Sequence, residues 1–139
     1  MKILESYKNS LKNPQVEEIL DLIIFRPLAF LLVLVLYRLP ITPNQITFLA
    51  MLSGIIAGYF YSLGDTSSFV WGAIFYGLSN VLDCSDGMIA RIKNNGTKVG
   101  RIIDGFVDYV VSIAVYVGLA SGLIKSGIDL PFAPWTLVV

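Results

Sequence analysis

The chain has 139 residues, of which 55% are hydrophobic and only 14% charged, and its mean hydropathy is +0.73. This composition lies outside that of soluble domains and indicates an integral membrane protein. Ten basic and ten acidic residues leave no net charge, which argues against a nucleic-acid partner. Histidine is absent and Cys84 is the single cysteine. A Ser-His-Asp triad, an imidazole-bound zinc ion and a disulfide within the chain are therefore excluded.

The N-terminal region lacks the apolar core and small-residue cleavage site of a signal peptide, so we expect it to be mature sequence. The first apolar run, residues 27–37, has eleven residues, fewer than the roughly 20 that a spanning helix needs. If this run spans the membrane, the basic residues divide five against five; if it lies in the interface, they divide nine against one. We therefore expect an interfacial amphipathic helix over residues 15–38, kinked near Pro27, with the N-terminus in the cytosol.

Three longer apolar segments follow, and each has about the length of a transmembrane helix. The predicted spans are residues 46–63, 69–90 and 102–124. A fourth apolar segment begins near Pro131, and the sequence ends inside it, so we expect a C-terminally incomplete helical bundle. The chain shows no repeat or linker, which predicts a single membrane-embedded domain over residues 1–139.

Short motifs mark how these helices begin and pack. In "TPNQIT", Thr42 or Asn44 can cap the first span, and Pro43 suits its first turn. The glycine pairs Gly54/Gly58 and Gly118/Gly122 have the GxxxG spacing that allows membrane helices to approach closely. We expect both pairs to serve helix packing rather than ligand binding.

Four aspartates interrupt the second and third spans. Asp83 and Asp86 lie one helical turn apart on the second span, and Asp104 and Asp108 lie one turn apart on the third. A loop of about ten residues, 91–101, joins the two spans and makes them antiparallel neighbours. From the helical rise, the acids lie roughly 4 to 12 Å below the flanking arginines. All four carboxyl groups are therefore expected at one depth.

A lone carboxylate at such depth costs about 2.5 kcal/mol or more, so four together need compensation. Neutralisation by basic neighbours at a solvated helix end is one explanation, but four acids at matched depth favour a functional site. Because only oxygen ligands are offered, we expect Mg2+ or Mn2+, ions that usually also hold substrate phosphates. The small residues Gly87, Ala90 and Gly100 leave room for a substrate. The joining loop can attract an anionic substrate through its basic residues, which are Arg91, Lys93, Lys98 and Arg101.

The complete pattern reads Asp83, two residues, Asp86-Gly87, two residues, Ala90-Arg91, eight residues, Gly100, three residues, Asp104, three residues, Asp108. It resembles the signature of the CDP-alcohol phosphotransferase family at every fixed position, and the resemblance extends over about residues 15–125. It implies a membrane enzyme of phospholipid biosynthesis, similar to a six-span homodimer. Such an enzyme transfers a substituted phosphate from a CDP-alcohol, often CDP-diacylglycerol, to an acceptor hydroxyl and releases CMP.

The resemblance also implies roles for individual residues. Asp83, Asp86 and Asp104 would be metal ligands, and Asp108 would complete the metal site and act as the base on the acceptor hydroxyl. The CDP site would be formed by Gly87, Ala90, Arg91 and Gly100, with Asn44 and Thr47 also lining it. The active site would face the cytosol from the cytoplasmic membrane.

Two other functions remain open from the residues alone. A UbiA-like prenyltransferase also uses membrane aspartates and Mg2+, but it would need two separated Asp-rich motifs, and the chain has one cluster. A divalent-cation transporter could use the acids to bind an ion in transit, which leaves the DGxxAR spacing and the basic loop unexplained. The identity of the acceptor alcohol does not follow from the sequence.

Overall fold

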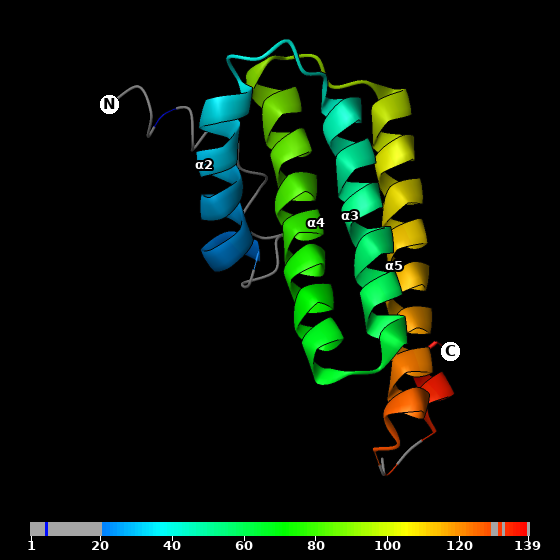
Figure 1. Ribbon diagram of the computed structural model, residues 1–139. Helices are drawn as coiled ribbons and strands as arrows, with labels where there is room; N and C mark the ends of the chain where they lie inside the picture. Colours follow the sequence, from blue (N-terminus) through cyan, green and yellow to red (C-terminus); the bar gives the residue numbers. More distant parts are fainter. Residues whose placement is uncertain (1–4, 6–20, 129–130, 132, 139) are drawn as a thin grey trace.

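The computed structural model describes residue 5 and residues 21–128, 131 and 133–138, and this part of the chain is helical with no strand. A π-helical turn, η1 (Asp21–Phe25), leads into α2 (Arg26–Leu36). Three long helices follow, α3 (Pro43–Leu63), α4 (Thr66–Ile92) and α5 (Lys98–Ser126), and then a 3-10 turn, η2 (Pro134–Leu137). The long helices lie side by side with alternating direction, and α2 lies beside α4 (Figure 1). The predicted all-helical fold is confirmed.

Two of the three predicted spans meet the length and apolarity of a membrane-crossing helix. These are α3 and α5. The third helix, α4, is 27 residues long but less apolar, because polar side chains such as Ser79, Asn80 and Asp83 interrupt it. Its assignment as a span stays a prediction.

Each long helix starts earlier than the hydropathy predicted, because a polar cap precedes it. The N-caps are Thr42, Asp65 and Thr97, and Oγ1 of Thr97 accepts a hydrogen bond of 2.9 Å from Gly100 N. The expected start in "TPNQIT" is confirmed, with Thr42 rather than Asn44 as the cap. The loop between α4 and α5 comprises only residues 93–97, so the expectation of about ten residues was wrong.

The glycine pairs hold α3 and α5 in backbone contact. A Cβ added to Gly118 would collide with the carbonyl oxygen of Gly58, and one added to Gly122 would collide with that of Tyr61. A Cβ on Gly54 would overlap the side chain of Val111. The predicted role of both pairs in helix packing is confirmed, and it brings the start of α3 close to the start of α5.

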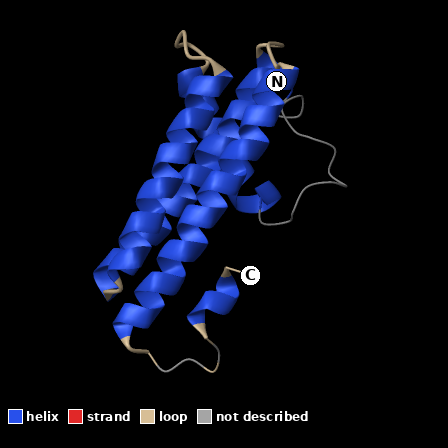
Figure 2. Ribbon diagram, turned by 90° about the vertical axis from the view of Figure 1, so that its right-hand side faces the viewer, coloured by secondary structure: helices blue, strands red, loops and turns tan. Residues whose placement is uncertain are grey.

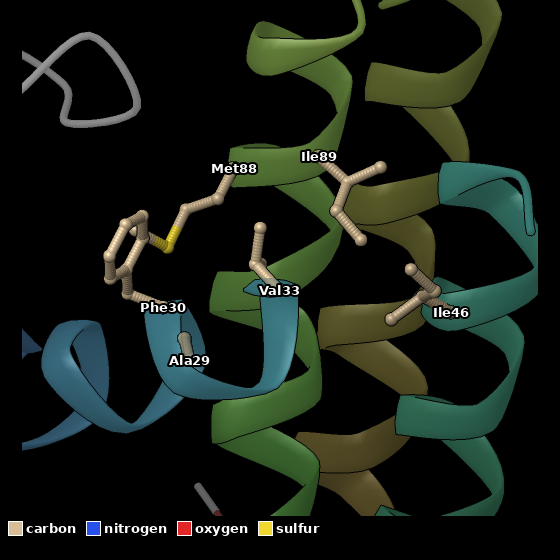
Figure 3. Close-up of a cluster of buried hydrophobic side chains, with 6 residues drawn as sticks. All are labelled: Ala29, Phe30, Val33, Ile46, Met88 and Ile89. Carbon is tan, nitrogen blue, oxygen red and sulfur yellow. The ribbon is translucent and has the colours of Figure 1, made fainter. Parts of the chain in front are cut away.

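The short helix α2 packs against α4 near the loop end of the bundle. Ala29, Phe30 and Val33 of α2 contact Met88 and Ile89 of α4 in a buried apolar cluster that Ile46 of α3 completes (Figure 3). Pro27 lies at the junction of η1 and α2, where the kink was expected. Residues 15–20 lie outside the described part, so the interfacial placement of residues 15–38 stays a prediction.

The C-terminal region returns toward α5, and the short helix η2 lies beside it (Figure 2). The described residues of the predicted fourth span are Pro131 and residues 133–138, and of these only Pro134–Leu137 form a 3-10 turn. The fourth span therefore stays a prediction.

Candidate active site

A cavity of about 550 Å3 lies at the end of the bundle where α3 begins, α4 ends and α5 begins. In Figure 1 these three helix ends are adjacent, together with the loop of residues 93–97. The cavity is lined by Thr42, Pro43, Asn44, Thr47, Asp86, Gly87, Ala90, Arg91, Asn94, Asn95, Gly96, Thr97, Gly100, Arg101 and Asp104.

This cavity gathers every residue that the sequence assigned to nucleotide binding. Those residues are Asn44, Thr47, Gly87, Ala90, Arg91 and Gly100. These six residues come from three helices, and the first and the last of them, Asn44 and Gly100, are 56 positions apart in the sequence. The sequence reasoning missed the loop residues Asn94 to Thr97, which also line the cavity. Their signal is local: an Asn-Asn-Gly-Thr run between two helices can turn the chain and cap the next helix.

Three of the four aspartates converge below this cavity. One carboxylate oxygen from each of Asp83, Asp86 and Asp104 lies within 4.8 Å of the other two. Asp86 is buried, and Oδ1 of Asp83 is buried with no hydrogen-bond partner among the described residues. A buried, unpartnered carboxylate oxygen is costly, and a hard divalent cation would satisfy it. The residues present therefore fit a hard divalent cation.

Thr47 connects α3 to this cluster. Its hydroxyl donates a hydrogen bond to Oδ2 of Asp86 and also lies 3.1 Å from the carbonyl oxygen of Pro43. Both Thr47 and Asp86 are buried. The threonine side chain thus contacts one carboxylate of the cluster and also lines the first cavity.

Asp108 lies outside the group of three carboxylates. It lines a second cavity, of about 280 Å3, together with Asp83. The described structure therefore places Asp108 next to the cluster along α5 rather than within it.

The basic residues of the loop region divide into two groups. Arg91 and Arg101 line the first cavity, whereas Lys93 and Lys98 do not. Nζ of Lys93 donates hydrogen bonds of 3.2 Å to the carbonyl oxygens of Leu39 and Ile41. The structure therefore supports attraction of an anion by the two arginines, and it gives Lys93 a different contact, to the connection between α2 and α3.

The start of α5 provides a further attraction for an anion. The N-terminus of a helix carries partial positive charge, and α5 begins at the wall of the cavity. Gly100 keeps this wall open, because an added Cβ would lie 3.1 Å from both Oδ1 of Asn44 and Oγ1 of Thr97. The arrangement offers an anionic group a helix N-terminus and two arginines, with carboxylates beneath for a metal ion.

Comparison with known proteins agrees with this geometry. The family model described as CDP-alcohol phosphatidyltransferase matches residues 40–139. A phosphatidylinositol phosphate synthase of Corynebacterium glutamicum is 31% identical over 104 residues, which are 75% of this chain and 45% of that protein. A CDP-diacylglycerol–inositol 3-phosphatidyltransferase of Candida albicans is 37% identical over 79 residues, 55% of this chain and 33% of that protein.

An archaetidylinositol phosphate synthase of Pyrococcus horikoshii is 30% identical over 87 residues, 63% of this chain and 45% of that protein. The matched region thus amounts to less than half the length of each of these relatives. The family match favours the nucleotide-linked reaction over a prenyltransferase or a cation transporter.

Proposed function

Because the chain belongs to the CDP-alcohol phosphatidyltransferase family, we propose that it transfers a phosphatidyl group from CDP-diacylglycerol to an alcohol and releases CMP. One observation carries the proposal: the same cavity contains all six residues expected at the CDP site, and two carboxylates of the metal-competent cluster line it. The reaction belongs to phospholipid biosynthesis, as the names of the relatives suggest.

In the proposed complex, the CDP group occupies the first cavity. Its phosphates lie toward the N-terminus of α5, where Arg91 and Arg101 offset their charge. Gly87 and Gly100 leave space for the nucleotide next to the backbone. A Mg2+ or Mn2+ ion held by Asp83, Asp86 and Asp104 would neutralise charge on the pyrophosphate.

Asp108 is the proposed general base. It takes the proton of the acceptor hydroxyl while the acceptor oxygen forms a bond to the phosphorus that carries the diacylglycerol. The bond from this phosphorus to the bridging pyrophosphate oxygen breaks, and CMP leaves with the electron pair. Asp108 follows Asp104 by one helical turn on α5, and this spacing supports a base next to the proposed metal site.

The acceptor class comes from the relatives. The relatives named above are a phosphatidylinositol phosphate synthase, an archaetidylinositol phosphate synthase and an inositol phosphatidyltransferase, so we propose an inositol or inositol phosphate acceptor first. We further propose a homodimer in the cytoplasmic membrane, with the N-terminus and the first cavity facing the cytosol.

The test is CMP release by the protein at its full natural length in lipid nanodiscs. CDP-diacylglycerol is supplied with inositol, inositol phosphate, glycerol phosphate or serine. We expect release with one of these acceptors in Mg2+ or Mn2+, none in EDTA, and at least a roughly 100-fold loss in Asp108→Asn. Asp65→Asn, at the opposite end of the bundle, is the matched control and should keep wild-type activity. Undiminished turnover in Asp108→Asn would remove Asp108 from the mechanism.

A further inference from the structure

The loop between α4 and α5 contains the dipeptide Asn95-Gly96, to which the proposed reaction gives no role. Both residues are exposed, have no regular secondary structure and line the first cavity. Asparagine is a chemically labile residue, because the main-chain nitrogen of the next residue can attack its side-chain amide. A hydrogen bond that holds this nitrogen in place opposes the attack, so the bonding of the loop decides whether it occurs.

The main-chain nitrogen that follows each asparagine differs among the described residues. After Asn44 and after Asn94, this nitrogen donates a hydrogen bond of 3.1 Å to a main-chain carbonyl oxygen. After Asn80 it lies inside α4, where the hydrogen bonds of the helix engage it. The nitrogen of Gly96, which follows Asn95, donates to no other residue in the described part of the chain. Asn95 is therefore the described asparagine whose neighbour is available to attack it.

Gly96 also keeps the approach to the Asn95 side chain open, since it carries no Cβ. Its backbone lies outside the left-handed region, and an added Cβ would lie 3.7 Å from Cβ of Ala90, an ordinary contact. Alanine therefore fits at position 96 without strain. The substitution Gly96→Ala can hinder the attack while the loop keeps its conformation.

We propose that Asn95 is a site of spontaneous deamidation that changes the charge of the first cavity. The nitrogen of Gly96 loses its proton to hydroxide and forms a bond to Cγ of Asn95. Ammonia leaves with the electron pair of the broken bond, and a five-membered succinimide remains. Water then opens this ring at one of its two carbonyl groups, which gives aspartate or isoaspartate. One water molecule is consumed, one ammonia is released, and nothing is oxidised or reduced.

The product places a new carboxylate on the wall of the first cavity. The charged residues of this wall are now balanced, two arginines against two aspartates: Arg91, Arg101, Asp86 and Asp104. A third acid makes the wall acidic overall, and a like charge repels an anionic occupant. On the proposed function that occupant is the pyrophosphate of CDP-diacylglycerol. We therefore expect deamidation to weaken binding of the donor.

The conversion is measured on the full-length protein in nanodiscs and requires no activity assay. Peptide mass spectrometry follows the change from amide to acid during incubation at alkaline pH, and enzymatic methylation detects isoaspartate. We expect Asn95 to convert at least about 10-fold faster than Asn44 or Asn80, and Gly96→Ala to slow it by a similar factor. Equal conversion at the three asparagines, or an Asn95 that stays intact, would contradict the proposal.

The effect on the cavity is measured as KM for CDP-diacylglycerol before and after the incubation. Asn95→Asp should raise KM roughly 3- to 10-fold, and incubated wild-type protein should approach the same value. Asn95→Gln keeps an amide but cannot close a five-membered ring, so its KM should not change during incubation. Ser67→Asp adds the same charge at the exposed start of α4, at the opposite end of the bundle, and is the matched control. Its KM should stay within about twofold of the wild-type value.

The two measurements separate this proposal from the proposed function, on which only its effect on donor binding rests. If CMP is released and Asn95 converts, but Asn95→Asp leaves KM unchanged, the effect on the cavity is wrong and the proposed function stands. If the wild-type protein releases no CMP with any acceptor, the proposed function fails, and the effect on donor binding fails with it. Mass spectrometry still decides whether Asn95 is a deamidation site.

Discussion

Thr47 is the residue through which α3 reaches the carboxylate cluster, and its hydrogen bond to Asp86 is testable with an isosteric change. Thr47→Val removes the hydroxyl and keeps the volume. Groups that orient a metal ligand typically contribute 10- to 100-fold to metal affinity. We therefore expect the Mg2+ concentration for half-maximal CMP release to rise roughly 10-fold. Thr47→Ser keeps the hydroxyl and should restore the wild-type value; equal Mg2+ dependence of Val and Thr proteins would contradict a positioning role.

Lys93 contacts the connection that leads into α3, so it influences the cavity indirectly. Its ammonium group donates to the carbonyl oxygens of Leu39 and Ile41 and lies 5.8 Å from the ring centroid of Tyr37. Lys93→Met should loosen the residues before Thr42 and raise KM for CDP-diacylglycerol by a factor of about 3 to 10. The effect should persist in 1 M salt, because it does not depend on long-range attraction.

The exposed Lys98 provides a matched control for this change, since Lys98→Met removes the same charge from the same region. We expect it to leave KM nearly unchanged. If both variants raised KM for CDP-diacylglycerol equally, and both increases disappeared in 1 M salt, the lysines would act by attracting the substrate, as the sequence alone had predicted.

Among the helices, α3 and α5 depend on glycine for their close approach. Gly118→Ala would place a methyl group against the backbone of Gly58, and such overpacking costs about 1 to 3 kcal/mol. Gly105→Ala is on the same helix with nothing within 4 Å of the added Cβ, so it should be neutral or stabilise α5 by up to about 1 kcal/mol. Thermal unfolding in detergent measures both. Similar melting temperatures for the two variants would contradict a stabilising close contact between α3 and α5 at Gly118.

The helices and their packing could be predicted because both depend on local periodicity. Hydropathy located α3 and α5, the TPNQIT motif located the start of α3, and the GxxxG spacing predicted the close packing that the structure shows between these two helices. The prediction was weakest for α4, whose polar side chains lower its apolarity as a span and at the same time form the site.

At the scale of the molecule, the six residues that the family resemblance assigned to the CDP site all line the first cavity, and four of them belong to the motif on two adjacent helices. The second cavity was not predicted, since its lining combines Ala50, Tyr76 and Ser112, which share no motif and meet only through packing. The role of Lys93 was missed for the same reason: its partners are backbone carbonyls 54 and 52 positions earlier in the chain. Charge can be counted from a sequence, whereas the contact that a charge makes depends on the fold.

The orientation of the bundle follows from the same charges and is the remaining prediction for the whole molecule. The connection after α2 and the loop of residues 93–97 lie at one end of the bundle (Figure 1). Arg38 and the basic residues of positions 91–101 gather there, while Lys125 lies at the other end of α5. Basic residues are retained on the cytosolic side, so we expect this end, and the first cavity with it, to face the cytosol.

Cysteine labelling in a Cys84→Ala background tests this orientation. Asn95→Cys places a thiol in the exposed loop, and Ser67→Cys places one at the exposed start of α4 at the opposite end. A membrane-impermeant maleimide added to intact cells should label Ser67→Cys and leave Asn95→Cys unmodified until the membrane is permeabilised. The readout does not require activity, so it holds even though Asn95 lines the cavity. The reverse pattern would place the nucleotide cavity outside the cell, where no cytosolic CDP-alcohol headgroup or soluble acceptor could enter it.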